Sequence, residues 1–242
     1  MAKVRCDWCN NSEIYVKYHD EEWGEPVYED QEFFEMLVLE SFQAGLNWLT
    51  ILKKREHFRE AFDDFDYKLI AQYSDAKVKE LLSNEGIIRH RGKIEATINN
   101  AKAFMSIQKI KGVSQKQTLL MITEGWCGDA APVIPIMKKI ADLNPLIDFK
   151  LILRDDNDEL MNEFLTNGGK SIPKLISFNL EENNILFTWG PRPKEAADLV
   201  AKEKAEFGKL RDEFKIILQK WYNQDKGKNI AEDLVYSLVQ SN

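Results

Sequence analysis

The chain of 242 residues lacks any long run of apolar residues. A membrane-spanning helix needs about 18 or more consecutive apolar residues, and no stretch reaches that length. The first residues also lack the apolar core of a signal peptide. Apolar residues make up 44% of the chain and charged residues 30%, which is typical of a soluble globular protein. We therefore expect a cytoplasmic protein with a substantial core.

Cysteine is scarce, with three residues in the chain. Cys6 and Cys9 lie close together in the sequence and Cys127 lies far away, so a disulfide framework is not favoured. Reduced thiols fit a cytosolic setting. Basic residues are also outnumbered, because 33 Lys and Arg face 40 Asp and Glu, for a net charge of −7. Since nonspecific affinity for nucleic acids comes from cations that neutralise phosphates, any DNA-binding site must be a local patch.

The two halves of the chain follow different patterns. Residues 32–108 show apolar residues at helical spacing almost throughout, with Asn47 and Ser74 as expected N-caps and Gly45 and Gly86 as expected helix ends. After residue 112, short apolar strands alternate with helical segments, which indicates a mixed α/β sandwich. A long amphipathic helix is expected over residues 193–222. The sequence thus predicts an all-α domain at residues 1–111 and an α/β domain at residues 112–242.

Glu40 stands out within the first half. It follows Phe33 and Leu37 and precedes Ala44 at steps of three and four, so a helix would place its carboxylate on an apolar face. A lone carboxylate on a buried face is costly unless it meets a partner. Aromatic rings are also concentrated near the N-terminus, at Trp8, Tyr15, Tyr18 and Trp23, with Trp48 later. Such rings with one carboxylate could bind a flat, cationic heterocycle, or they could simply be core.

A glycine-containing turn joins two expected helices after residue 83. Glycines at a helix N-terminus let backbone N–H groups approach a phosphate, and flanking cations add attraction. The spacing alone fits either a helix-hairpin-helix DNA anchor or an ordinary helical corner with a solvated basic surface. The candidate DNA-binding residues are Gly86, Arg89, His90, Arg91, Gly92 and Lys93.

Four motifs in the first half carry a resemblance to a known family. RCDW, YHDEEWG, LESFQAGLNWLTILKKRE and GIIRHRGKI occur in this order. They resemble the 3-methyladenine DNA glycosylase I family over about residues 5–108. The resemblance implies that Glu40 hydrogen-bonds the extruded methylated base, and that residues 86–93 form the hairpin that grips duplex DNA. It implies an aromatic base pocket built from Trp8, Tyr18, Trp23 and Trp48.

The implied activity is hydrolysis of the N-glycosidic bond of a flipped-out alkylated adenine, as in base excision repair. No lysine nucleophile of a bifunctional lyase is matched, so a monofunctional enzyme is expected. The family's pattern is cut short here. Members carry a late His and Cys that complete a zinc site with an early Cys and His, and only Cys6 and His19 match that set. The resemblance therefore implies zinc with an incomplete ligand set, to which Cys9 could add.

The second half contains WCGDA after a strand and SIPKL before another. With the strand and helix order, these resemble the thioredoxin-like superfamily over about residues 117–222. Cys127 would lie at a helix N-terminus, where the dipole favours thiolate, and Pro173 would be a cis-proline facing it. Ala130 stands where a second cysteine of a C-x-x-C site would be. Cys127 is then either a monothiol with a thiol partner or an inert side chain.

Three interpretations of the whole chain remain open at this point. The first is a DNA-3-methyladenine glycosylase fused to a thioredoxin-like domain. The second is a monothiol or thiol-binding protein with a vestigial glycosylase segment. The third is an inactive fusion of two gene fragments. The sequence predicts no oligomeric state.

Overall fold

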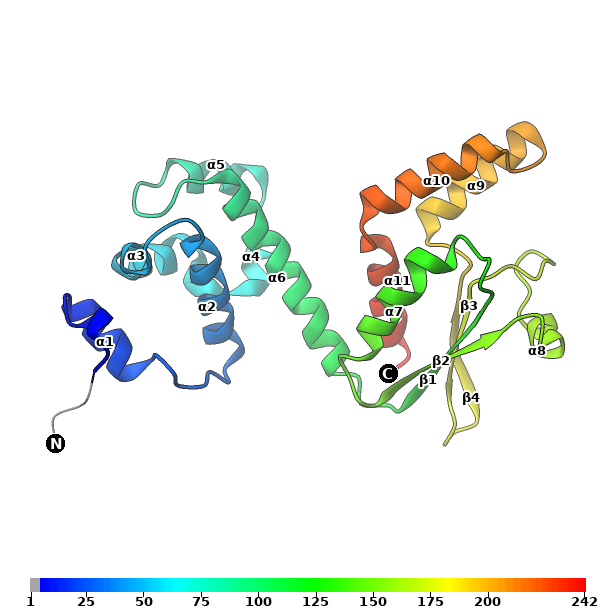
Figure 1. Ribbon diagram of the computed structural model, residues 1–242, viewed down its shortest axis with the longest axis horizontal. Coiled ribbons are helices and arrows are strands. Elements are labelled where there is room, and N and C mark those ends of the chain that lie inside the picture. Colours follow the sequence, from blue (N-terminus) through cyan, green and yellow to red (C-terminus); the bar gives the residue numbers. More distant parts are fainter. Residues whose placement is uncertain (1–4) are drawn as a thin grey trace. The chain divides into compact units, whose positions relative to one another are not determined.

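The computed structural model describes residues 5–242, and its contacts divide the chain after Ser106 into two compact units (Figure 1). The border between the two units, at Ser106 and Ile107, lies inside one continuous helix, α6 (Arg91–Lys111). The domain border at residue 111 stays a prediction from the sequence.

The first unit is helical, as its sequence pattern predicts, and no strand occurs in residues 5–106. Its longer helices are α1 (Glu13–Glu21), α2 (Asp30–Gln43), α3 (Trp48–Ala61), α5 (Asp75–Ser83) and α6. A short helix α4 (Tyr67–Ile70) and two 3₁₀ turns, η1 (Asp7–Cys9) and η2 (Asp63–Phe65), complete it.

Predicted helix ends are confirmed where a specific side chain or backbone angle fixes them. The Asn47 side chain accepts a hydrogen bond from the Leu49 backbone N–H at 2.8 Å, and Ser74 accepts one from Lys77 at 3.4 Å. Gly45 lies two residues after the end of α2 and has φ +79°, a left-handed conformation that favours glycine.

The core of the first unit is rich in phenylalanine. The ring of Phe42 on α2 lies 4.8 Å from that of Phe58 on α3, in an edge-to-face contact. Phe62 and Phe65 stack with their centroids 6.2 Å apart. All four side chains are fully buried, together with Phe34. Burial of these rings dominates the stability of this unit.

A buried ion network ties three helical segments of the first unit together. The Glu35 carboxylate on α2 accepts hydrogen bonds from Arg55 Nε at 2.6 Å and Arg59 Nε at 3.0 Å, both on α3. Arg55 Nη1 also donates to Glu22 Oε2 at 2.6 Å, just after α1. Burial alone would lower the pKa of Arg55, but its bonds to Glu35 and Glu22 raise it overall. No local pattern in the sequence indicates this network.

The second unit contains a four-stranded mixed sheet in the order β2-β1-β3-β4. β1 (Gln117–Thr123) pairs in parallel with β2 (Ile147–Leu153) and antiparallel with β3 (Lys174–Asn179), which pairs antiparallel with β4 (Asn184–Trp189). The helices are α7 (Ala130–Ala141), α8 (Asp158–Glu163), α9 (Lys194–Phe207), α10 (Asp212–Asp225) and α11 (Lys228–Gln240). The predicted α/β sandwich is thus confirmed as a mixed four-stranded sheet with helices.

Both faces of the sheet are covered by helices. Alternation along β1 places Leu119 and Met121 in the main core, which also includes residues of α7, α9, α10 and α11. Ile122 points to the other face and joins a smaller cluster with Met161 of α8. Helices α7 and α11 lie side by side over the sheet (Figure 1).

One helix prediction for the second unit is wrong. The segment 193–222 is two helices rather than one, because Gly208 adopts φ +71° after α9 and the chain resumes as α10 at Asp212. A left-handed residue satisfies the last carbonyls of a helix and ends it.

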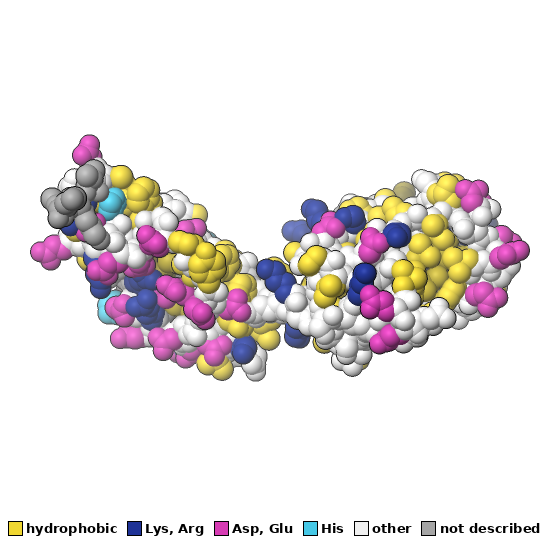
Figure 2. All heavy atoms as spheres, turned by 90° about the horizontal axis from the view of Figure 1, so that it is seen from below, with side chains coloured by type: hydrophobic (Ala, Val, Ile, Leu, Met, Phe, Trp, Pro, Cys, Tyr) yellow, Lys and Arg dark blue, Asp and Glu magenta, His cyan; other side chains and the backbone are white. Residues whose placement is uncertain are grey.

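No helix in residues 5–242 is long and apolar enough to span a membrane. The visible surface of the first unit mixes acidic and basic side chains, whereas hydrophobic side chains gather on part of the second unit (Figure 2). The face shown in Figure 2 thus has no broad cluster of Lys and Arg side chains, consistent with the acidic net charge.

Candidate functional site

The first unit contains a hollow of about 560 Å³ lined mainly by aromatic rings. We call it the aromatic hollow; its lining residues are Trp8, Tyr15, Tyr18, Trp23, Glu40, Gln43 and Trp48. The structure therefore brings together the predicted carboxylate and all four predicted aromatic residues, which come from η1, α1, α2, α3 and the segment after α1.

Edge contacts between rings hold the walls of the hollow. Trp8 and Trp23 have centroids 5.6 Å apart at 75°, and Tyr18 and Trp48 are also 5.6 Å apart at 65°. Tyr15 packs edge-on against Trp8 at 5.4 Å. Edge-to-face contacts leave ring faces available, and a flat ligand can stack on them.

Gln43 lines the hollow without having been predicted as a site residue, and Tyr15, one of the aromatic residues noted near the N-terminus, was left out of the base pocket that the family resemblance implied. Tyr15 lies three residues before Tyr18 on α1, and Gln43 three residues after Glu40 on α2. Residues three apart share a helix face, so this spacing was the signal that could have found both. The Tyr15 hydroxyl also accepts a hydrogen bond from the Leu49 backbone N–H at 3.0 Å, which ties α1 to the start of α3.

Glu40 is not on the buried face of α2, so that prediction is wrong. The residues of α2 that are fully buried include Phe34, Val38 and Phe42, whereas Glu40 and Phe33 are exposed. The apolar stripe that contains Glu40 faces outward, at the rim of the aromatic hollow. Within residues 5–242, the Glu40 carboxylate makes no hydrogen bond or ion pair, and so its oxygens remain available to a ligand.

The lining of the hollow also includes a hydrogen-bond donor without a partner in the described residues. The indole N–H of Trp48 is buried and has no hydrogen-bond partner in the described chain. The Trp48 N–H lies close enough to the Tyr18 hydroxyl to stabilise its deprotonated form. The two groups do not, however, have the geometry of a hydrogen bond. The pKa of the Tyr18 hydroxyl is nevertheless raised, mainly by burial and further by the negative charges of Glu22 and Glu40. Tyr18 is therefore a neutral hydroxyl at neutral pH.

The predicted zinc ligands do not form a metal site in the part of the chain described. His19 Nε2 accepts a hydrogen bond from the Cys6 backbone N–H at 3.3 Å, and the Cys9 thiol, fully buried, donates to the Cys6 carbonyl. Across residues 5–242, no group of three or more His, Cys, Asp or Glu is placed to hold a metal ion. A tetrahedral zinc site needs four ligands, so the residues present do not fit one.

The predicted hairpin is a turn over residues 84–90 between α5 and α6. Arg89 and Arg91 are exposed and form loose ion pairs with Glu85 at 3.4 Å and Glu95 at 3.1 Å. Exposed pairs of this kind contribute little, so phosphates could replace the carboxylates. His90 acts locally, because its Nδ1 accepts a hydrogen bond from the Lys93 backbone N–H at 3.3 Å at the start of α6.

Tertiary contacts hold this turn in place. The Lys54 ammonium on α3 donates to the carbonyls of Glu85 and Gly86 at 3.0 and 2.9 Å. A side chain at Gly86 would meet the Asn84 side chain and His57 Cβ at 3.0 Å, so the turn packs closely there. Gly92 is exposed, and the nearest obstacle to a side chain there is His90 at 3.3 Å.

Lys93 has a structural task that the sequence did not reveal. Its ammonium donates to the carbonyls of Phe42 and Ala44, both at 2.6 Å, at the end of α2. A lysine that satisfies the last carbonyls of a helix stabilises the helix dipole. Lys93 is therefore committed within the unit and is a poorer candidate for a phosphate contact than Arg89 or Arg91.

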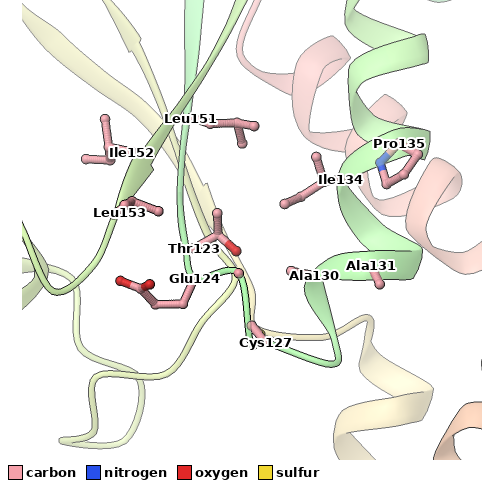
Figure 3. Close-up of a pocket in the computed structure, with 11 residues that line it drawn as sticks. Thr123, Glu124, Cys127, Ala130, Ala131, Ile134, Pro135, Leu151, Ile152 and Leu153 are labelled. Atoms are coloured by element: carbon pink, nitrogen blue, oxygen red, sulfur yellow. The ribbon is translucent and has the colours of Figure 1, made fainter.

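In the second unit, Cys127 lies three residues before α7, and the Ile172–Pro173 peptide bond is cis, as predicted. The Cys127 thiol donates to the Ile172 carbonyl at 3.4 Å, so the two segments meet. Figure 3 shows Cys127 at one end of a cavity of about 470 Å³. The Thr123 hydroxyl, also in its wall, is buried without a hydrogen-bond partner in the described chain.

The position of Cys127 before α7 does not lower the pKa of its thiol. Burial raises the pKa of its thiol and outweighs the backbone N–H groups at the start of α7 that favour thiolate. Asp129, the residue directly before α7, does not cap the helix with its side chain. Instead it accepts hydrogen bonds from Arg192 Nε and the Tyr222 hydroxyl, each at 2.9 Å. The geometry favours a protonated, slowly reacting thiol.

Two family models match the chain. A model described as methyladenine glycosylase matches residues 8–125, and a model described as thioredoxin matches residues 82–206. The chain belongs to the thioredoxin family, whose model covers just over half of it, and its residues 8–125 are similar to the methyladenine glycosylase family. The two matches overlap at residues 82–125, which contain α6 and β1.

Individual relatives agree with the glycosylase match. The DNA-3-methyladenine glycosylase of Haemophilus influenzae is 49% identical over 106 residues, which are 44% of this chain and 57% of that protein. DNA-3-methyladenine glycosylase 1 of Escherichia coli is 46% identical over 105 residues, 43% of this chain and 56% of that protein. The chain thus spans little more than half the length of these curated relatives.

A crystal structure of 3-methyladenine DNA glycosylase I is 38% identical to the chain. The alignment covers 58% of this chain and 83% of that one, with a TM-score of 0.42. The family assignment rests on the sequence matches.

Proposed function

We propose that the glycosylase segment binds an alkylated adenine in the aromatic hollow and hydrolyses its N-glycosidic bond, as a base excision repair enzyme. The observation that carries this proposal is the unpaired Glu40 carboxylate at the rim of a hollow walled by aromatic rings. Such a site suits a flat cation with hydrogen-bond donors better than it suits a neutral apolar ligand.

N3-methylated adenine has these properties, because it carries a positive charge in the nucleotide and an exocyclic amine. Its ring would stack on the indole and phenol faces, and Glu40 would accept from the amine. The positive charge would be attracted both to the carboxylate and to the negative faces of the rings. Unmodified adenine lacks that charge, so the same contacts discriminate against it.

The reaction is a hydrolysis in which the cationic base leaves readily. The bond between the sugar C1′ and the base N9 breaks, and its electron pair cancels the positive charge of the base. A water oxygen forms the new bond to C1′, and the water proton passes to solvent. None of the seven residues that line the hollow is a lysine, in keeping with a monofunctional enzyme that forms no imine with the sugar.

Duplex DNA that contains alkylated bases is the proposed partner, because the base must be flipped out of the helix to enter the hollow. We assign the hairpin formed by α5, residues 84–90 and α6 to the DNA backbone. The exposed cations Arg89 and Arg91 and the N–H groups at the start of α6 support this role.

Arg89→Ala and Arg91→Ala are each expected to weaken duplex binding without changing the fold. Each lost phosphate contact should reduce the slope of log affinity against log salt by about 1. Lys79→Ala is the matched control, since Lys79 is exposed on α5 outside the turn. Fluorescence anisotropy with a labelled duplex over a salt series measures the slope. Equal slopes in all three variants would remove the hairpin from the DNA interface.

The monothiol function is less well supported, because burial raises the pKa of Cys127 and Ala130 stands where a resolving cysteine would be. A thiol partner for Cys127 stays a prediction from the sequence.

The binding step can be tested by tryptophan fluorescence of the full chain. Three tryptophans line the hollow, and the 3,9-dimethyladeninium cation, which keeps the positive charge of the methylated nucleotide, is expected to stack there and quench their emission in a saturable way. Trp48→Phe should reduce the change, whereas Trp221→Phe, in the second unit, should keep it. Unmodified adenine is the control ligand. A linear change, the same for both bases, would contradict specific binding.

A further inference from the structure

The strand β2 forms one edge of the sheet in the second unit. β1 is its only strand neighbour within residues 5–242. Two hydrogen bonds show which backbone groups of β2 face β1, since the Gln117 N–H donates to the Leu146 carbonyl and the Arg154 N–H donates to the Thr123 carbonyl. With the parallel register Gln117↔Ile147 to Thr123↔Leu153, the even-numbered residues of β2 bond to β1.

The odd-numbered residues of β2 therefore direct their backbone groups to the free edge. Phe149 and Leu151 each present an N–H and a C=O there, Ile147 presents its C=O and Leu153 its N–H, since the Leu153 carbonyl accepts a hydrogen bond from Asn157 Nδ2 at 2.8 Å. Leu151 and Leu153 are 51% and 48% exposed, which is high for leucines on a strand. An exposed apolar edge strand is a template for pairing with another strand.

An apolar groove runs along this edge. Leu151 and Leu153 project toward α7, where Ile134 and Pro135 face them, while Ile152 projects to the opposite side of the sheet (Figure 3). The groove is the cavity of about 470 Å³ described above. A strand added at the edge would extend the sheet and cover the mouth of this groove.

The charges on β2 select the occupant. On the side away from α7, Asp148 and Lys150 are both exposed and alternate along the strand, 3.0 Å apart. We propose that the occupant is β2 of a second copy of this chain, paired antiparallel about a two-fold axis at Phe149. This register places Asp148 of each copy opposite Lys150 of the other, and it satisfies the self-complementarity that a two-fold interface requires.

The same register matches apolar residues and backbone groups. Ile147 of one copy lies opposite Leu151 of the other, so the exposed leucine gains an apolar neighbour. The two Phe149 residues exchange a pair of backbone hydrogen bonds, and each Leu151 N–H donates to the opposite Ile147 carbonyl. A register centred one residue along, at Lys150, would place the two lysines opposite each other, and like charges there are unfavourable.

Charge reversal and charge exchange test the pairing in the full-length protein. Asp148→Lys and Lys150→Asp are each expected to weaken self-association by about tenfold, because each places two like-charged pairs across the interface. The double variant D148K/K150D restores opposite charges in this register and should restore association. Asp198→Lys, which breaks an exposed Lys–Asp pair on α9, is the matched control and should change nothing.

Sedimentation velocity over a concentration series measures the association, with circular dichroism to confirm that each variant is folded. Recovery in the double variant beside loss in both single variants supports the pairing. A wild-type chain that is monomeric at every concentration would overturn the proposal. So would a double variant that associates as weakly as the single ones. Neither result bears on the glycosylase proposal, since that site lies in the first unit.

Discussion

Glu40→Gln is expected to lower the rate of base release from alkylated DNA by about 10- to 100-fold. A hydrogen bond to a charged group contributes about 1.5–3 kcal/mol, and each 1.4 kcal/mol corresponds to about tenfold in rate. The change keeps the size of the side chain and removes its charge, so the loss would come from weaker attraction to the cationic base. Because Glu40 is exposed and has no internal partner, the stability of the fold should not change.

Glu32→Gln is the matched control for this variant. Glu32 lies on the same helix, is exposed and does not line the aromatic hollow. Its rate should stay within about twofold of the wild type, as for most surface substitutions. Rates are measured as free methylated base released under single-turnover conditions. Equal rates for both variants and the wild type would remove Glu40 from the site.

Arg55→Met is expected to lower the free energy of unfolding of the first unit by about 3 kcal/mol. The substitution keeps an apolar stem but leaves the buried Glu35 carboxylate with Arg59 alone and removes the link to Glu22. Removing one partner of a buried ion pair costs about 3–5 kcal/mol, and the remaining Arg59 places this site at the lower end. Urea denaturation followed by tryptophan emission measures the change.

This variant also reports on how the hollow is held. Glu22 immediately precedes Trp23, so the Arg55–Glu22 bond anchors that part of the wall to α3. Lys53→Met, at an exposed position of the same helix, is the control and should leave stability nearly unchanged. A wild-type unfolding curve for Arg55→Met would mean that the network adds nothing beyond the hydrophobic core.

The sequence predicted those features that depend on local chemistry. The N-caps at Asn47 and Ser74 and the helix end at Gly45 follow from short-range hydrogen bonding and backbone conformation. The alternation that defines the strands is likewise local, and the order of strands and helices restricts the fold of the second unit to an α/β sandwich. Ordered family motifs added the grouping of Glu40 with the aromatic residues.

Features that depend on tertiary contacts were missed or mistaken. Helical spacing shows which residues share a face of α2, but it does not show whether the stripe with Phe33 or the one with Phe34 is buried. The partners of Glu35 lie 20 and 24 residues away, and those of Lys93 lie about 50 away. No local pattern encodes such pairings.

Two opposing effects act on the pKa of the Cys127 thiol, and only the structure shows which is larger. The position before α7 favours thiolate, and this effect could be inferred from the sequence. Burial of Cys127 beside the Ile172–Pro173 segment raises the pKa instead, and burial is a property of the folded unit. The same cavity wall includes the exposed leucines of β2, which the strand pattern alone would have placed in the core.

We propose that the aromatic hollow of the glycosylase segment acts on alkylated adenine in DNA. The most direct test is to incubate the full chain with methylated duplex DNA and to identify the products by chromatography. We expect release of 3-methyladenine as the free base, with the DNA backbone left uncut. A folded protein that releases no methylated base at any enzyme concentration would contradict it.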